Sequence, residues 1–106
     1  MHSKRKISTV WNIHPGEILR EEVLKPIKMS SYELAAHLHV PAPRINDIIL
    51  EKRGITADTA LRLARYFSTT EQFWMNLQVS YEVRKAKGQI GRELLKIRPR
   101  RSNTAA

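Results

Sequence analysis

The chain of 106 residues contains no cysteine, so it has no disulfide, no thiolate zinc site and no cysteine nucleophile. Apolar runs are short, and none approaches the roughly 18 residues that a membrane-spanning helix requires. The basic N-terminus lacks the apolar stretch of a secretory signal. The 42% of apolar residues suffice for a modest core in about one domain. Together these features predict a soluble cytoplasmic protein with no membrane partner.

Recognisable catalytic patterns are also missing. The sequence has no Ser–His–Asp arrangement, no glycine-rich phosphate loop and no inward pair of carboxylates. His37 and His39 are two residues apart on or beside a helix, so their side chains point apart and do not predict a shared metal site. We therefore expect no enzymatic activity, no catalytic residue, no metal and no cofactor.

Positive charge dominates the composition but is confined to the two ends of the chain. The formal net charge is +9, of which residues 1–6 contribute +3 and residues 84–106 contribute +7. Residues 7–83 are left with a net charge of −1. An excess of basic residues indicates an anionic partner such as nucleic acid, although two solvated tails would produce the same composition.

Five helical segments are predicted between Pro15 and Gly88. Their starts are marked by Pro15, by Ser30 with Glu33 as a capping box, by Pro43, by Thr56, and by Thr69 with Gln72 as a second capping box. The first segment should end at Lys25, before Pro26, and the last at Gly88. Their apolar faces predict a core of Ile18, Leu19, Val23, Leu34, Ala35, Leu38, Ile45, Ile48, Ile49, Ala60, Leu61, Ala64 and Phe67.

This pattern predicts an all-α fold, because no stretch alternates over the length of a buried strand. Residues 1–13 form a basic N-terminal arm, in which "RKISTVW" can add a short extended piece. Residues 14–88 form the helical domain. Residues 89–106 are predicted to be a flexible basic tail.

The second and third helical segments have the spacing of a helix-turn-helix motif. Each is about 8–9 residues long, and "HVP" joins them; in such motifs the second helix lies in the DNA major groove. At about 100° per residue, the isoleucines of "VPAPRINDIILEKRG" face inward and its other side faces outward. The predicted base contacts on that outward side are Ala42, Pro43, Arg44, Asn46 and Asp47.

Each of these residue types suits a particular base. Arg44 can pair in bidentate fashion with guanine and Asn46 with adenine. Pro43 or Ala42 can touch a thymine methyl group, and Asp47 can accept from cytosine N4. Asp47 would repel phosphates, however, and a plain helix-surface charge is the alternative interpretation of both Asp47 and Glu51.

Phosphate contacts are predicted at two places that flank this helix. Lys52 and Arg53 follow it directly, with solvated surface charge as the alternative interpretation. The N-terminus of the second segment, Ser30, Ser31 and Tyr32, offers backbone amides and a helix dipole to an anion.

The last segment carries two apolar stripes. Phe73, Trp74, Leu77 and Tyr81 form one, and Met75, Val79, Val83 and Ala86 form the other. A helix on the outside of a small domain needs only one such stripe, so the second predicts a further buried contact, most commonly a two-fold dimer. We predict that Met75, Val79, Val83 and Ala86 form the interface of a homodimer; absorption of both stripes into one core is the alternative.

The stretches "HPGEIL", "KRGIT" with "TALRLA", and "FWMNLQ" resemble the HigA (VapI-type) branch of the Xre helix-turn-helix family. The likeness runs from about His14 to Val83. The chain departs from the family pattern at Pro41, in place of a Ser or Thr cap, and at Leu50 and Glu51, in place of Asn-Gly.

This resemblance implies a lambda-repressor-like domain that dimerises through its C-terminal helices. It also implies binding to a palindromic operator in double-stranded DNA ahead of its own operon, and neutralisation of a RelE-like toxin that cleaves mRNA. We therefore predict an antitoxin and autorepressor of a type II toxin–antitoxin module. The alternatives are a stand-alone Xre-type regulator without a toxin, and an RNA-binding or scaffold protein that works through its basic tails.

Overall fold

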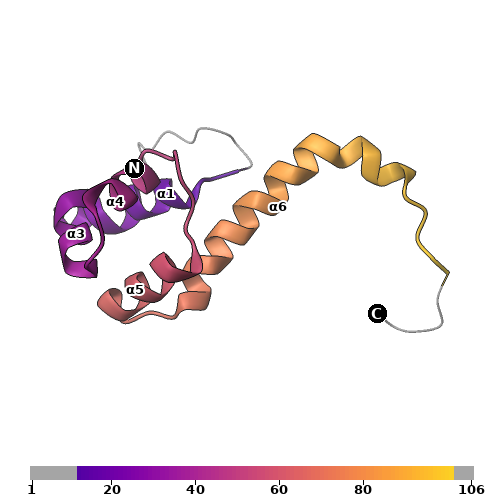
Figure 1. Cartoon of the computed structure of the whole chain (residues 1–106). Helices are drawn as coiled ribbons and strands as arrows, with labels where there is room; N and C mark the ends of the chain where they lie inside the picture. The colour runs from indigo at the N-terminus through magenta and orange to yellow at the C-terminus, as the bar shows by residue number, and fades with distance from the viewer. Residues whose placement is uncertain (1–11, 102–106) are drawn as a thin grey trace.

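The computed structural model describes residues 12–101, and over that range the chain forms five helices and no strand (Figure 1). The first helix runs continuously through α1 (Pro15–Ile18), the π-helical η1 (Leu19–Leu24) and α2 (Lys25–Ile27). It is followed by α3 (Ser31–Leu38), α4 (Ala42–Ile49), α5 (Ala57–Phe67) and α6 (Glu71–Lys96). The predicted all-α class with five helices is confirmed. The extended piece predicted at residues 5–11 lies outside the described residues.

The first helix does not end at Lys25, so that prediction is wrong. Lys25 keeps helical backbone angles, with φ −59° and ψ −48°, and the helix continues through Pro26 to Ile27. The preceding π-helical segment accounts for this: the Lys25 amide donates to the carbonyl of Arg20, five residues earlier. Pro26 has no amide proton to donate, and the wider π turn leaves room for its ring.

Four left-handed positions at the ends of helices are occupied by residues other than glycine. Lys28, His39, Glu51 and Ser68 have φ between 55° and 63°. Glycine usually fills such positions, because a Cβ atom there costs roughly 1–2 kcal/mol. None of the chain's four glycines has a positive φ. The usual sequence signal for the end of a helix is therefore missing at each of these ends.

The last helix continues past Gly88, which corrects the predicted end and the predicted tail. α6 extends to Lys96, with one non-helical residue, Ile90 (φ −118°, ψ 15°), inside it. Gly88 does not stop the helix because it does not adopt the left-handed conformation that ends one. Residues 89–96 of the predicted flexible tail are thus helical, and α6 projects well beyond the other helices (Figure 1).

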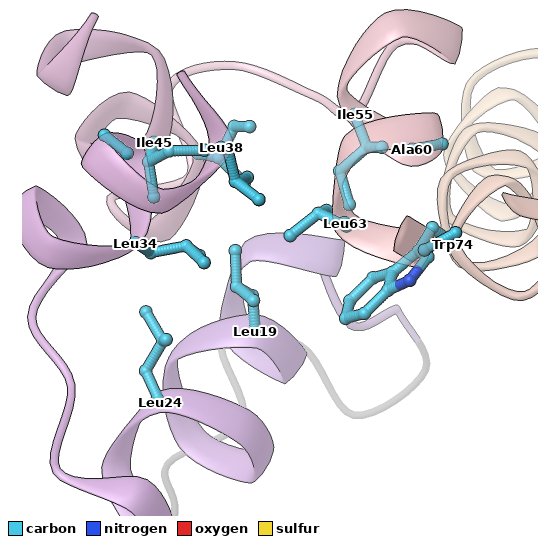
Figure 2. Packing of buried hydrophobic residues seen from close by; sticks show 12 residues of the cluster. Leu19, Leu24, Leu34, Leu38, Ile45, Ile55, Ala60, Leu63 and Trp74 are labelled. Carbon is cyan, nitrogen blue, oxygen red and sulfur yellow. The ribbon is translucent and has the colours of Figure 1, made fainter. Parts of the chain in front are cut away.

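The hydrophobic core joins all five helices (Figure 2). Among its largest fully buried side chains are Leu19, Leu34, Ile45, Ile48, Leu63 and Trp74, each at most 1% exposed. Leu61 was expected in the core and is 56% exposed, whereas Leu63 takes the buried position on α5. Apolar residues lie on several sides of α5, so their spacing alone does not decide which of the two faces inward.

Trp74 attaches α6 to the bundle and also explains an error in the predicted cap. The cap of α6 is Thr70, whose hydroxyl accepts from the Phe73 amide at 3.1 Å. The hydroxyl of Thr69, the predicted cap, instead accepts from the Trp74 indole nitrogen at 2.8 Å. The buried indole N–H is thereby satisfied, which a tryptophan in a core requires.

Candidate nucleic-acid interface

The start of α4 is set by Pro41, which adopts an extended conformation (φ −62°, ψ 142°) as the residue that caps the helix. The helix therefore begins at Ala42, one residue earlier than the start predicted at Pro43. Pro43 stands in the first turn, where its missing amide proton would have no partner within the helix. Both prolines are thus compatible with a helix that packs closely against α3.

α4 has one face in the core and one face available at the surface. Ile45 and Ile48 are fully buried, while Pro43 is exposed and Ala42, Arg44, Asn46 and Asp47 are partly exposed. The five predicted base contacts therefore all reach the surface of the same helix. The inward orientation of the isoleucines fixes which side of α4 a ligand can approach.

Asn46 is tied to the start of α3. The Ser31 hydroxyl donates to Asn46 Oδ1 at 3.2 Å, and Ser31 is only 7% exposed. This bond engages Asn46 Oδ1 and not its amide nitrogen, which is a two-hydrogen donor. Since the Ser31 hydroxyl donates to Asn46, Ser31 would contact a phosphate through its backbone amide.

Arg44 belongs to a chain of charged groups that links three helices. Its Nη1 donates to Asp58 Oδ1 of α5 at 2.6 Å, and the Nε of Arg62 donates to the same oxygen at 2.7 Å. Arg62 Nη1 also donates to the carbonyl of Leu38, at the end of α3, at 2.8 Å. The hydrogen bonds from Arg62 and Arg44 lower the pKa of Asp58, so this carboxyl stays ionised at neutral pH.

The acidic residues of the "VPAPRINDIILEKRG" stretch have partners within the protein. Asp47 Oδ2 lies 3.8 Å from Arg53 Nη2. Glu51 Oε2 accepts from Arg20 at 3.4 Å, and Arg20 also donates to the carbonyl of Ile49. Glu51 therefore braces the end of α4 against the first helix, in a left-handed conformation. This bond corrects the alternative interpretation of Glu51 as a plain surface charge.

The predicted phosphate contacts lie around both ends of the helix pair. Lys52 and Arg53 follow α4 directly and are exposed. At the start of α3, Ser30 and Glu33 form the predicted capping box, with bonds of 2.8 and 3.0 Å. Tyr32, in the same turn, is 65% exposed. The capping box is confirmed, and the phosphate contacts at these residues remain predictions.

The "HPG" sequence at the start of α1 holds α4 in place. His14 caps α1, and its Nδ1 accepts from the Gly16 amide at 2.8 Å. Burial lowers the pKa of His14, which keeps the ring neutral and able to accept. A Cβ atom on Gly16 would lie 1.8 Å from the carbonyl oxygen of Ile48. The absence of a side chain at Gly16 is what lets α1 and α4 touch.

Gln78 is a contact that the sequence did not predict. It is 7% exposed, and its Oε1 accepts from the Ile55 amide at 2.7 Å while its Nε2 donates to Glu82 at 2.7 Å. A Cβ atom on Gly54 would lie 2.6 Å from Gln78 Oε1. Gln78 thus fixes the loop that follows Lys52 and Arg53. A polar residue between two apolar stripes gave no sequence signal for this role.

His37 and His39 make separate contacts. His37 stacks on Tyr66 with ring centroids 4.9 Å apart, and His39 is the left-handed residue that ends α3. Among residues 12–101 no group of three potential metal-ligating side chains comes together. Over the same range no helix is long and apolar enough to cross a membrane.

α6 presents a stripe of apolar side chains to solvent. Val79 and Val83 are 49% and 45% exposed, Met75 is partly buried and Ala86 is exposed. Beyond the predicted end of the helix, Ile90, at the non-helical position, and Leu94 are also exposed, at 44% and 43%. On the opposite side of α6, Trp74 and Gln78 are buried in the domain. Phe73, which was expected to pack inside, is 45% exposed and contacts Trp74 edge to face.

Comparison with known proteins places this arrangement in a family. A family model described as helix-turn-helix matches residues 21–74, which is just over half of the chain. Virulence-associated protein I of Dichelobacter nodosus is 59% identical over 75 residues, covering 71% of this chain and 69% of that protein. The chain belongs to the Xre-type helix-turn-helix family. The resemblance inferred from "HPGEIL", "KRGIT" and "FWMNLQ" is thereby confirmed.

Within the Xre-type family, two solved antitoxin structures match nearly over their whole length. Antitoxin HigA of Pseudomonas aeruginosa, solved with the higBA promoter, is 51% identical with a TM-score of 0.79, covering 82% of this chain and 96% of that one. Antitoxin GraA, solved in complex with its operator, is 42% identical with a TM-score of 0.80, covering 95% of this chain and 99% of that one. The Xre-type fold seen here is therefore that of HigA and GraA.

Proposed function

We propose that this protein is an antitoxin and autorepressor that binds a palindromic operator as a homodimer, with α4 in the major groove. The observation that carries the proposal is the outward edge of α4, where Arg44 and Asn46 stand over a buried isoleucine face. HigA and GraA, which share this fold at 51% and 42% identity, were solved with a promoter and an operator.

The outward side of α4 would contact the DNA bases. Arg44 would pair with guanine, and Asn46 with adenine through its free amide nitrogen and the second lone pair of Oδ1. Ala42 and Pro43 would contact a thymine methyl group, and Asp47 would accept from cytosine. Lys52, Arg53 and the start of α3 at Ser30, Ser31 and Tyr32 would hold the phosphates, which position α4 without specifying sequence.

The apolar stripe of α6 would form the dimer. Its residues, Met75, Val79, Val83, Ala86, Ile90 and Leu94, are separated by four, four, three, four and four positions. The series of spacings is the same when it is read from either end. In two antiparallel copies, Met75 would therefore face Leu94, Val79 would face Ile90 and Val83 would face Ala86. A two-fold dimer of this kind would place its two α4 helices on half-sites about one DNA turn, or ~34 Å, apart.

The proposal of a toxin partner is supported by the relatives alone. HigA and GraA are antitoxins, and we propose that this chain likewise neutralises a RelE-like, mRNA-cleaving toxin in the cytoplasm. Co-expression with the adjacent reading frame, with a tag on this chain only, should co-purify a small basic protein at equal stoichiometry. Recovery of this chain alone, from a locus without such a frame, would favour the stand-alone regulator.

Operator binding should depend steeply on salt, since each phosphate contact releases a counterion. A band shift with the duplex upstream of the coding sequence should weaken strongly between low and moderate salt. Changing Lys52 or Arg53 to alanine should weaken binding to every sequence and reduce the salt slope by about one each. Arg65→Ala is the matched control, because Arg65 is an exposed residue in the last turn of α5 that shares a surface with His37 and does not lie on α4. Binding that is insensitive to salt would contradict the proposal.

A further inference from the structure

Asp58 occupies an unusual position for an acidic residue in a DNA-binding protein. It is more than half exposed, and a carboxylate close to phosphates weakens binding. Its carboxylate does not cap α5, because Thr56 fills that role by accepting from the Thr59 amide. As an exposed ion pair it contributes little to stability. Asp58 binds two arginines, Arg62 and Arg44, and of these Arg44 is a predicted base contact.

Asp58 is itself held in place by a hydrogen bond from Arg62. Arg62 binds Asp58 Oδ1 at 2.7 Å and the carbonyl of Leu38 at 2.8 Å, and lies 3.3 Å from the carbonyl of His39. The carboxylate is thereby fixed to the turn between α3 and α4. Its bond to Arg44 occupies Nη1, so the Nε–Nη2 edge of the guanidinium can still donate two parallel hydrogen bonds.

We propose that Asp58 determines DNA sequence specificity by orienting Arg44 before DNA arrives. A free arginine side chain adopts many rotamers, and fixing it at an interface reduces affinity. Asp58 takes over that ordering in the unbound protein, and the Nε–Nη2 edge that it leaves can pair with O6 and N7 of a guanine. Asp58 is a positioning residue that acts through Arg44, and this inference rests on the proposed binding of DNA by α4.

This role predicts opposite changes in two measured quantities. Without its charge at position 58, the protein should lose preference for one base pair, because Arg44 is no longer oriented. At the same time its affinity for unrelated DNA should rise, because a negative charge near the phosphates is gone. A structural role for Asp58 would instead weaken binding to all sequences together.

The test is Asp58→Asn, compared with the unaltered protein on a pool of random-sequence duplexes and on single-base variants of the preferred duplex. The base pair read by Arg44 is identified as the one whose preference disappears in Arg44→Ala. At that pair, Asp58→Asn should lower the preference by about 2- to 10-fold, the range expected for releasing one ordered side chain. Preferences at the other pairs should be unchanged.

Two further variants complete the experiment. The double variant Arg44→Ala with Asp58→Asn should show the same base preference as Arg44→Ala alone, because Asp58 acts only through Arg44. Glu71→Gln removes an exposed first-turn charge from α6 and should leave every base preference unchanged. Equal thermal unfolding of all variants establishes that they are folded.

The outcomes separate this inference from the proposed function. If Asp58→Asn keeps its preference at the Arg44 pair, or loses affinity evenly for all sequences, the role of Asp58 is overturned while DNA reading by α4 stands. If the unaltered protein selects no sequence from the pool, both are overturned.

Discussion

Replacing Gly16 with alanine is expected to destabilise the protein by about 3 kcal/mol, the upper range for overpacking a well-packed site. The added Cβ atom would lie 1.8 Å from the carbonyl oxygen of Ile48 and 2.8 Å from its carbon. Both are backbone atoms, which cannot turn aside as a flexible side chain can. The midpoint of thermal unfolding, followed by circular dichroism, should fall by roughly 12–24 °C for a domain of this size.

Gly88→Ala is the matched control for this substitution. A Cβ atom on Gly88 meets nothing within 4 Å in the described part of the chain, and Gly88 lies in the interior of α6. Alanine there should favour the helix by about 0.5–1 kcal/mol. If Gly16→Ala unfolded at the same temperature as Gly88→Ala, close packing of α1 on α4 at this point would be disproved.

The Gly16 contact also bears on function. α1 touches α4 at Ile48, whose side chain is fully buried in the core. A shift of α4 away from α1 would move Arg44 and Asn46 relative to the exposed Lys52 and Arg53. We therefore expect any Gly16→Ala protein that remains folded to bind DNA less selectively than the unaltered protein.

The starts of the helices were more predictable from the sequence than their ends. Ser30 with Glu33, and Thr56, cap helices as expected, because a cap is a local contact between residues three apart. The ends at Lys28, His39 and Ser68 carry no glycine, and Gly88 ends nothing. Pro26 was misleading in the same way, since the π-helical segment that accommodates it has no recognised sequence signal.

The candidate interface was predictable as a set of residues but not as a set of contacts. The outward side of α4 follows from the spacing of its isoleucines, which is a local property. The partners of Arg44 and Glu51 come from other helices, 14 and 31 residues away in the sequence. Such contacts depend on how the helices pack against one another, and they cannot be predicted from the spacing of apolar residues along one helix. The hydrogen bond between Arg44 of α4 and Asp58 of α5 is one such contact.

Changing Val79 to lysine is expected to break the proposed homodimer into monomers and to weaken operator binding by roughly 100-fold or more. The stripe on α6 would have to bury the new ammonium group opposite the apolar side chain of Ile90 of a second copy, and removing an ammonium group from water is costly. Without the dimer, the second half-site no longer benefits from being held close to the first, an effect worth roughly 100- to 10,000-fold. Light scattering measures the mass and a band shift measures the affinity.

Leu95→Lys is the matched control, since Leu95 is 87% exposed on α6 and lies off the stripe. It adds the same charge to the same helix and should leave the dimer and the operator affinity intact. The stripe can also be tested from its distal end: Ile90→Lys should reproduce the effect of Val79→Lys, because the antiparallel arrangement sets these two residues against each other. A dimer that survives Val79→Lys would show that another surface joins the two copies. A dimer lost in Val79→Lys but kept in Ile90→Lys would restrict the interface to the first half of α6 and rule out the antiparallel arrangement, which requires both.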